Sequence, residues 1–275
     1  MSGYGELTRV GSVLSGMPQF QELPPGGTCA RCSQEYLGLP EGSTDQICDR
    51  CASVVEQGER ILARAAELVD AELLDAGLAA REREASIERI PAEIRRKLPH
   101  ATARALLAGE APQVGFGLSG TPGIGKTMAL AVLVARYGRA RLERLARAGE
   151  SRRLRGWLAW ATWKATTERM RALSLQDGGH AEVNRLVERY SAAEIVVIDD
   201  LGAERIRGSY ADDWATSMLD RIVDARDREI RPVWYTTNLG REALQKLYGS
   251  RLWSRLCGVA PLVELGAGPD LRLRR

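Results

Sequence analysis

The sequence lacks any apolar run long enough to cross a membrane. A membrane-spanning helix needs about 20 consecutive, mostly apolar residues, and no stretch of the chain approaches that length. The first residues, MSGYGELTRVGSVLSGMPQF, also lack the basic start and the continuous apolar core of a secretory signal. We therefore expect a soluble, cytoplasmic protein.

The chain also lacks a fixed-period repeat, a long low-complexity tract and a large net charge. With 275 residues, 44% of them hydrophobic, it can bury a full core, either as one large domain or as a large domain with a small appendage. The net charge of +3 says little about partners. Its distribution says more, because Arg136 to Arg171 contain eleven Lys or Arg residues against three Glu.

Cysteine is sparse, but four of the five cysteines form a pattern. Cys29 and Cys32 lie in CARC, and Cys48 and Cys51 lie in CDRC, fifteen residues further on. This spacing is typical of a structural zinc site, in which four thiolates close a tetrahedron. Redox-active thiols are the alternative. Cys257 lies outside the pattern and is expected to be a small packing residue.

Changes in composition divide the chain into four parts. Residues 1–27 end in PPGG and predict a loose lead-in, and 28–54 hold the paired cysteines. Residues 55–90 are charged and rich in Ala and Leu, with apolar residues at helical spacing, which predicts a helical linker. Residues 91–275 form the main domain.

Strand and helix patterns alternate along the main domain. Helices are expected at about 125–137, after Thr167 and around 210–227, and they separate four apolar segments: VGFGL, WLAWATW, EIVVID and VWYTTN. Alternation of this kind predicts an α/β fold in which helices flank a parallel sheet.

The segment GTPGIGKT, residues 120–127, matches the P-loop pattern GxxxxGK[ST]. It follows a strand pattern and precedes a helix pattern, as a phosphate-binding loop must, so a chance Gly-rich turn is the weaker interpretation. Lys126 is expected to contact the terminal phosphates of the bound polyphosphate, and Thr127 to ligate Mg²⁺. The predicted nucleotide-binding residues are Gly120, Thr121, Pro122, Gly123, Ile124, Gly125, Lys126 and Thr127.

Two carboxylates follow the apolar run Ile195 to Ile198. Open parallel sheets bind ligands at the carboxyl ends of their strands. We expect Asp199 to hold Mg²⁺ and Asp200 to act as the general base for the attacking water, although such a pair alone is often only a turn or a helix cap. Asn238, at the end of VWYTTN, is a candidate for orienting that water.

The order of these parts resembles the AAA+ ATPases: GTPGIGKT as Walker A, VVIDD as Walker B, TTN as sensor 1, and then SRLWSRL. More narrowly, IDDLGAE, TTN and a short SRL helix near the C-terminus are similar to the DnaC/DnaI-type loaders of replicative helicases and to the related IstB-type transposition ATPases. The resemblance covers residues 90 to 275.

The resemblance implies further roles. It makes Arg255 an arginine finger that acts on the ATP of a neighbouring subunit in an ATP-dependent oligomer, with Arg251 as its neighbour in the same motif. Arg272 is implied as a second sensor arginine, although too little chain remains for a full helical lid. Asp200 stands where most AAA+ enzymes have Glu, so hydrolysis is expected to be weak and stimulated by assembly.

The most favoured function is an ATP-dependent loader of a DnaB-like replicative helicase. The DnaI-type loaders have an N-terminal zinc domain that engages the helicase, and the zinc pattern here is similar, whereas IstB-type proteins lack it. The alternatives are an IstB-like helper that binds duplex DNA and a transposase, and a nucleotide-gated adaptor with little hydrolysis. The zinc pattern and the paired arginines disfavour a small-molecule kinase.

Single-stranded DNA is the expected nucleic-acid partner of the basic stretch. Its arginines are interleaved with Trp157, Trp160 and Trp163, and basic grooves with aromatic platforms hold single strands. If WLAWATW is a strand, Trp157 and Trp163 share one face and Trp160 takes the other. At least two of the rings are then expected in the core.

Overall fold

The computed structural model divides the chain into two compact units, Met1–Glu56 and Gln57–Arg275. The residues that it describes are 27–31, 33, 35–36, 47–78, 80–83, 88, 90–108, 110, 112, 114–150, 154–204, 206–207, 210–211 and 213–271. Except for Gly27, the predicted lead-in lies outside these residues. The division places residues 57–90, most of the expected linker, in the same unit as the main domain.

The first unit contains a small hairpin and the start of a helix. Strands β1 (Gly27–Thr28) and β2 (Glu35–Tyr36) pair antiparallel. Helix α1 (Asp49–Ala63) begins directly after Cys48 and places Cys51 in its first turn. The turn after β1 and the start of α1 therefore carry the described cysteines of the predicted zinc pattern.

The second unit is built on a five-stranded parallel sheet with the order β4-β5-β8-β3-β9. Its strands are β3 (Phe116–Ser119), β4 (Leu158–Thr162), β5 (Ile195–Leu201), β8 (Val233–Thr237) and β9 (Leu262–Glu264). The predicted α/β class is confirmed. The sequence did not predict β9, because a three-residue strand carries almost no periodic signal.

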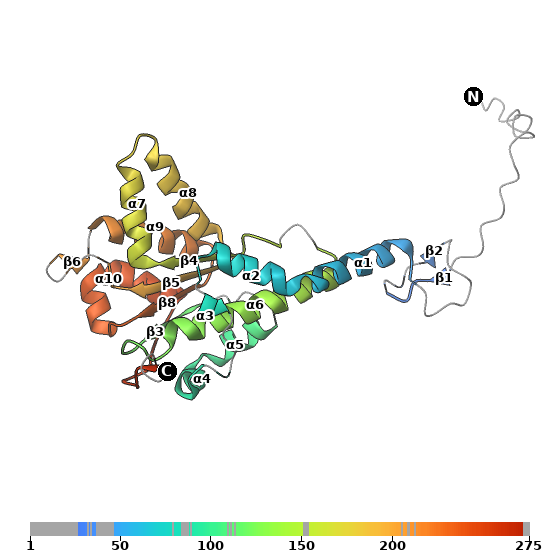
Figure 1. Cartoon of the computed structure of the whole chain (residues 1–275), viewed down its shortest axis with the longest axis horizontal. Helices are drawn as coiled ribbons and strands as arrows, with labels where there is room; N and C mark the ends of the chain where they lie inside the picture. The colour runs from blue at the N-terminus through green and yellow to red at the C-terminus, as the bar shows by residue number, and fades with distance from the viewer. Residues whose placement is uncertain are drawn as a thin grey trace, which may run out of the picture. The chain divides into compact units, whose positions relative to one another are not determined.

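Helices cover both faces of this sheet (Figure 1). They are α2 (Ala65–Asp75), α3 (Ala80–Arg83), α4 (Ala92–Lys97), α5 (His100–Leu107), α6 (Lys126–Ala148), α7 (Trp163–Ser174), α8 (Gly179–Ala192), α9 (Asp213–Arg228) and α10 (Arg241–Val259). A short hairpin, β6 (Ile206–Arg207) and β7 (Tyr210–Ala211), joins β5 to α9. Within the described residues, no helix is both long and apolar enough to cross a membrane.

Strand residues alternate between two hydrophobic cores. Leu158 and Trp160 of β4 pack into the core that contains α2 and α6. Ala159 and Ala161 point to the opposite face and pack into the core that contains α7, α8, α9 and α10. Strands buried on both faces read as continuous apolar runs in the sequence, which is why β4 and β5 were predicted correctly.

Helix α2, from the region expected to be a linker, packs on α6. Val69 and Leu73 are buried in the first core. Glu72 is also buried, and its two carboxylate oxygens accept hydrogen bonds from the backbone N–H groups of Gly156 and Leu158, both at 3.1 Å. Since β4 is an edge strand among the strands that the structure describes, this carboxylate bonds backbone donors at the open edge of the sheet.

The tryptophans of the basic stretch are core residues. Trp157, Trp160 and Trp163 expose 2%, 7% and 0% of their surface. The expectation that Trp157 and Trp163 share a face is wrong, because Trp157 precedes β4 and packs edge-on against Tyr137, with ring centroids 5.5 Å apart. Buried rings offer no platform to bases, so the structure contradicts stacking of DNA on these three side chains.

Candidate functional site

The predicted phosphate-binding loop connects the end of β3 to the start of α6. Gly123 and Gly125 have φ values of +81° and +93°, which residues with a side chain rarely adopt. Gly125 caps α6, whose 23 residues direct the positive end of the helix dipole at the loop. This unit therefore has the fold of a P-loop nucleotide-binding protein.

Lys126 lies within the loop and is 7% exposed. Its Nζ donates to the carbonyl oxygens of Gly120 at 2.7 Å and Thr121 at 2.9 Å, and to Oδ1 of Asn238 at 2.9 Å. Asn238 in turn donates from Nδ2 to Oδ1 of Asp200 at 2.9 Å. The structure thus brings together three residues that were predicted from separate segments.

Asp199 is the centre of a second set of contacts. Thr127 donates to its Oδ1 at 2.9 Å, and Thr236 donates to the same atom at 2.6 Å. Burial raises the pKa of Asp199, and the neighbouring charge of Asp200 adds to the shift, although the two threonine hydrogen bonds oppose it. A divalent cation would offset the cost of burying this carboxylate, so the donor set of Thr127 and Asp199 fits Mg²⁺.

Asp200 lies where the regular pairing of β5 with β8 breaks. The register shifts between Ile198 and Leu201, and Asp200 has a φ of +58°. Its backbone N–H donates to Oγ1 of Thr236 at 2.9 Å. Thr236 therefore contacts both carboxylate residues, a role that sequence reasoning missed even though the threonine stands in the TTN segment that was singled out.

These residues line a cavity of about 570 Å³. Of the predicted residues, it is lined by Pro122, Gly123, Gly125, Lys126, Thr127, Asp199, Asp200 and Asn238. Glu82 of α3, Met128, Thr162 and Leu271 line it as well and were not predicted. Nothing in the local sequence singles out Glu82, because only the packing of α3 brings it to this cavity. Ile124 is buried in the core.

The C-terminal segment lies against the same loop. The backbone N–H of Leu271 donates to the carbonyl oxygen of Gly123 at 3.0 Å. Gly268 contacts Thr121, whose Oγ1 accepts from the Gly268 N–H at 3.4 Å. Arg272, the candidate second sensor, lies outside the described residues.

The paired arginines lie on α10, which is kinked at Gly249 (φ +79°, ψ 159°). Arg251 is exposed. Arg255 is partly buried and forms ion pairs with Asp220 and Asp224 of α9, both at 3.1 Å. The carboxylates of α9 therefore offset the like-charge repulsion that two arginines four residues apart would otherwise cause.

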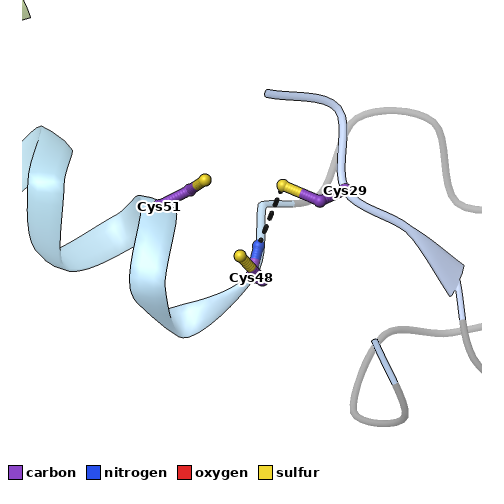
Figure 2. Close-up of side chains that lie close together, drawn as sticks. All are labelled: Cys29, Cys48 and Cys51. Atoms are coloured by element: carbon purple, nitrogen blue, oxygen red, sulfur yellow. Dashed lines mark hydrogen bonds between the residues drawn. The ribbon is translucent and has the colours of Figure 1, made fainter. Parts of the chain in front are cut away.

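Three cysteine sulfurs converge in the first unit (Figure 2). The Sγ atoms of Cys29, Cys48 and Cys51 lie within 4.8 Å of one another, and all three residues are buried. The backbone N–H of Cys48 donates to Sγ of Cys29 at 3.4 Å. Hydrogen bonding and the N-terminus of α1 both favour thiolates, the form that binds zinc. Cys32 lies outside the described residues.

Comparisons with known proteins find likenesses in structure but not in sequence. No protein-family model and no curated protein matches the sequence. Among solved structures, the chain is similar to the DnaC helicase loader, with 19% identity and a TM-score of 0.47 over 68% of this chain and 99% of that one. It is similar to DnaI, with 21% identity and a TM-score of 0.48 over 70% and 94% of the two chains. It is also similar to AMPPCP-bound DnaA from Aquifex aeolicus, with 19% identity and a TM-score of 0.46 over 66% and 50%.

Proposed function

We propose that the chain binds ATP with Mg²⁺ in the cavity beside the P-loop and hydrolyses it to ADP and phosphate. The observation that carries this proposal is the run of contacts from Lys126 through Asn238 to Asp200. It lies beside the pair of Thr127 and Asp199 and in front of the N-terminus of α6. The lysine proposed to bind phosphate, the pair proposed to bind Mg²⁺ and the proposed general base thus line one cavity.

Each residue has a separate task in the proposed reaction. Lys126 exchanges its carbonyl partners for the terminal phosphates, and Thr127 with Asp199 holds Mg²⁺, which when bound neutralises charge on the β- and γ-phosphates. Asp200 accepts a proton from the attacking water as the water oxygen bonds to the γ-phosphorus and the bond to the β,γ-bridging oxygen breaks. Asn238 orients that water.

Two substitutions test the proposal. We expect Asp200→Asn to keep ATP binding but to lower kcat by about 10²-fold or more, since general-base catalysis contributes about 10² to 10⁴. Lys126→Ala should weaken ATP binding itself, as measured by calorimetry. A normal kcat in Asp200→Asn would make Asp200 a structural residue. No turnover by the wild-type protein with DNA and partner present would leave the nucleotide-gated adaptor as the function.

For the whole chain, we propose an ATP-dependent loader that holds a DnaB-like helicase through its N-terminal unit. The sequence resemblance of residues 90 to 275 and the converging thiols of Cys29, Cys48 and Cys51 support this assignment. Co-purification with the helicase of the same host tests it, with the Cys48→Ser variant as the comparison. Absence of that complex together with ATP-dependent filaments on duplex DNA would instead identify an IstB-like transposition helper.

We further propose that single-stranded DNA binds to exposed basic residues of the main unit. Arg136 and Arg139 are exposed on α6, and Lys164 and Arg169 are exposed on α7. These helices cover opposite faces of the sheet, so the two pairs of exposed basic residues lie on different faces (Figure 1). Charge reversal of each pair separately, followed by a salt titration of DNA binding, identifies the face that contacts phosphates. Affinity that is insensitive to salt would contradict the proposal.

A further inference from the structure

A buried carboxylate links the loop that follows Asp200 to helix α10. Glu204 exposes 3% of its surface, and its Oε2 accepts a hydrogen bond from the backbone N–H of Gly202 at 2.8 Å. Its Oε1 accepts from the hydroxyl group of Tyr248, which is buried as well. The two residues are 44 positions apart in the sequence, and a buried acid of this kind is costly unless both of its oxygens are bonded.

At one end, this contact fixes the backbone directly behind the proposed general base. Gly202 follows Asp200 by two residues and has a φ of +91°. A Cβ at Gly202 would lie 2.6 Å from Cδ1 of Leu239, which precedes α10, and 3.6 Å from Cδ2 of Leu247 in the first half of α10, so the turn also lies against these two leucines. The turn that follows Asp200 and the end of β5 is therefore held by Glu204 and by the two leucines that it lies against.

At its other end, the contact reaches the kink in α10. Tyr248 is the last residue before Gly249, where the helix bends, and the half-helix beyond the bend carries Arg251 and Arg255. Burial, followed by the charge of Glu204, raises the pKa of Tyr248 well above its ordinary value, so its hydroxyl group remains a donor. Hairpin strand β7 packs against α10 as well.

We propose that Glu204 and Tyr248 form a positioning pair that couples the loop behind Asp200 to the orientation of the second half of α10. This inference rests on the proposed ATPase function and deepens it. A shift of Asp200 on nucleotide binding is transmitted through Gly202 and Glu204 to the kink, and there it sets the direction of the arginines offered to a neighbouring subunit. Neither residue lines the cavity beside the P-loop.

The test is Tyr248→Phe in the full-length protein, with Tyr235→Phe as the matched control. Tyr235 is buried as well, but its hydroxyl group has no hydrogen-bond partner among the described residues, so removing it breaks no such contact. Two readouts are needed: the increase in ATP turnover with protein concentration, and hydrogen–deuterium exchange of residues 250–259 with and without a non-hydrolysable ATP analogue.

We expect Tyr248→Phe to keep ATP affinity and the turnover of dilute protein within about twofold of the wild-type values. The factor by which assembly stimulates turnover should fall about tenfold, as expected for the loss of one buried hydrogen bond to a charged group. Nucleotide-dependent exchange in 250–259 should also disappear, while Tyr235→Phe behaves as wild type. Unchanged stimulation and exchange in Tyr248→Phe would overturn the coupling. So would an equal loss of ATP affinity and of all turnover, which indicates a purely structural role.

If wild-type protein shows no turnover, the ATPase proposal fails, and the exchange readout alone then decides the coupling.

Discussion

At the residue scale, the TTN segment joins the two carboxylates to the P-loop. Asn238 bonds both Lys126 and Asp200, and Thr236 bonds both Asp199 and the backbone of Asp200. Thr236 lies in β8 and Asn238 directly follows it, and β8 lies between β5 and β3 in the sheet. Because this strand lies between the two, the TTN segment at its end contacts both the carboxylates of β5 and the P-loop that follows β3.

The arginine finger is a prediction at this scale. Arg255 is held by Asp220 and Asp224 in partly exposed ion pairs, which typically contribute only about 0 to 1 kcal/mol. It can therefore exchange them for the γ-phosphate of a neighbouring subunit. We expect Arg255→Ala to keep ATP affinity nearly intact and to lower turnover in the assembled state by about 10³-fold or more, as measured by steady-state phosphate release.

Arg251→Ala is the matched control for that experiment, because Arg251 lies one helical turn away and is exposed. Arg255→Lys adds a second comparison, since lysine keeps the charge but loses the planar fork of guanidinium donors. Normal assembled turnover in Arg255→Ala together with its loss in Arg251→Ala would transfer the finger role to Arg251.

At the scale of elements, buried charged side chains fix how helices meet the sheet. Arg226 of α9 is fully buried and bonds backbone carbonyl oxygens, among them those of Tyr190 and Ala193 at the end of α8 and of Pro232 before β8. Carbonyl groups at a helix C-terminus carry partial negative charge, which stabilises the guanidinium group. Arg226 thereby anchors the segments that lead into β5 and β8.

Glu72 has the corresponding role on the other face, and its substitution gives a prediction about stability. Glu72→Ala leaves the N–H groups of Gly156 and Leu158 without their acceptors at the edge of β4. We expect the free energy of unfolding of the main unit to fall by about 3 to 6 kcal/mol, because two hydrogen bonds to a charged group are lost and each contributes about 1.5 to 3 kcal/mol. Urea titration measures this change.

Glu67→Ala on the same helix is its control. Glu67 is exposed and pairs only loosely with Arg64, at 3.6 Å. Surface substitutions of this kind usually change stability by less than about 0.5 kcal/mol. If Glu72→Ala and Glu67→Ala unfold at the same urea concentration, Glu72 does not hold the edge of the sheet.

At the scale of the whole molecule, two units have different sources of stability. The main unit has two hydrophobic cores, whereas the core formed by the described residues of the first unit consists of three cysteines with Ile47 packed against them. A core of that size cannot offset the conformational entropy of ordering the chain. We therefore propose that zinc, bound by Cys29, Cys32, Cys48 and Cys51, supplies the folding energy of the first unit.

Metal removal tests this division. We expect the wild-type protein to contain a single zinc ion per chain, measured by its release in a colorimetric assay. The Cys48→Ser variant should lose both this zinc ion and the binding of the helicase. ATP turnover by the main unit should be retained. Cys257→Ser, outside the cluster, should keep its zinc. Purified protein without zinc, or full zinc content in Cys48→Ser, would contradict the proposal.

The sequence by itself determined the α/β class, the P-loop, the two carboxylates and the cysteine pattern. Each depends on local features: an apolar run, a spacing, or a glycine required at a positive φ. Only the tertiary structure decided that Thr236 bonds both carboxylate residues, that Glu82 lines the cavity, that all three tryptophans rather than at least two are buried, and that Glu204 meets Tyr248. These contacts join residues far apart in the sequence, and strand order and helix packing, rather than any local pattern, place them together.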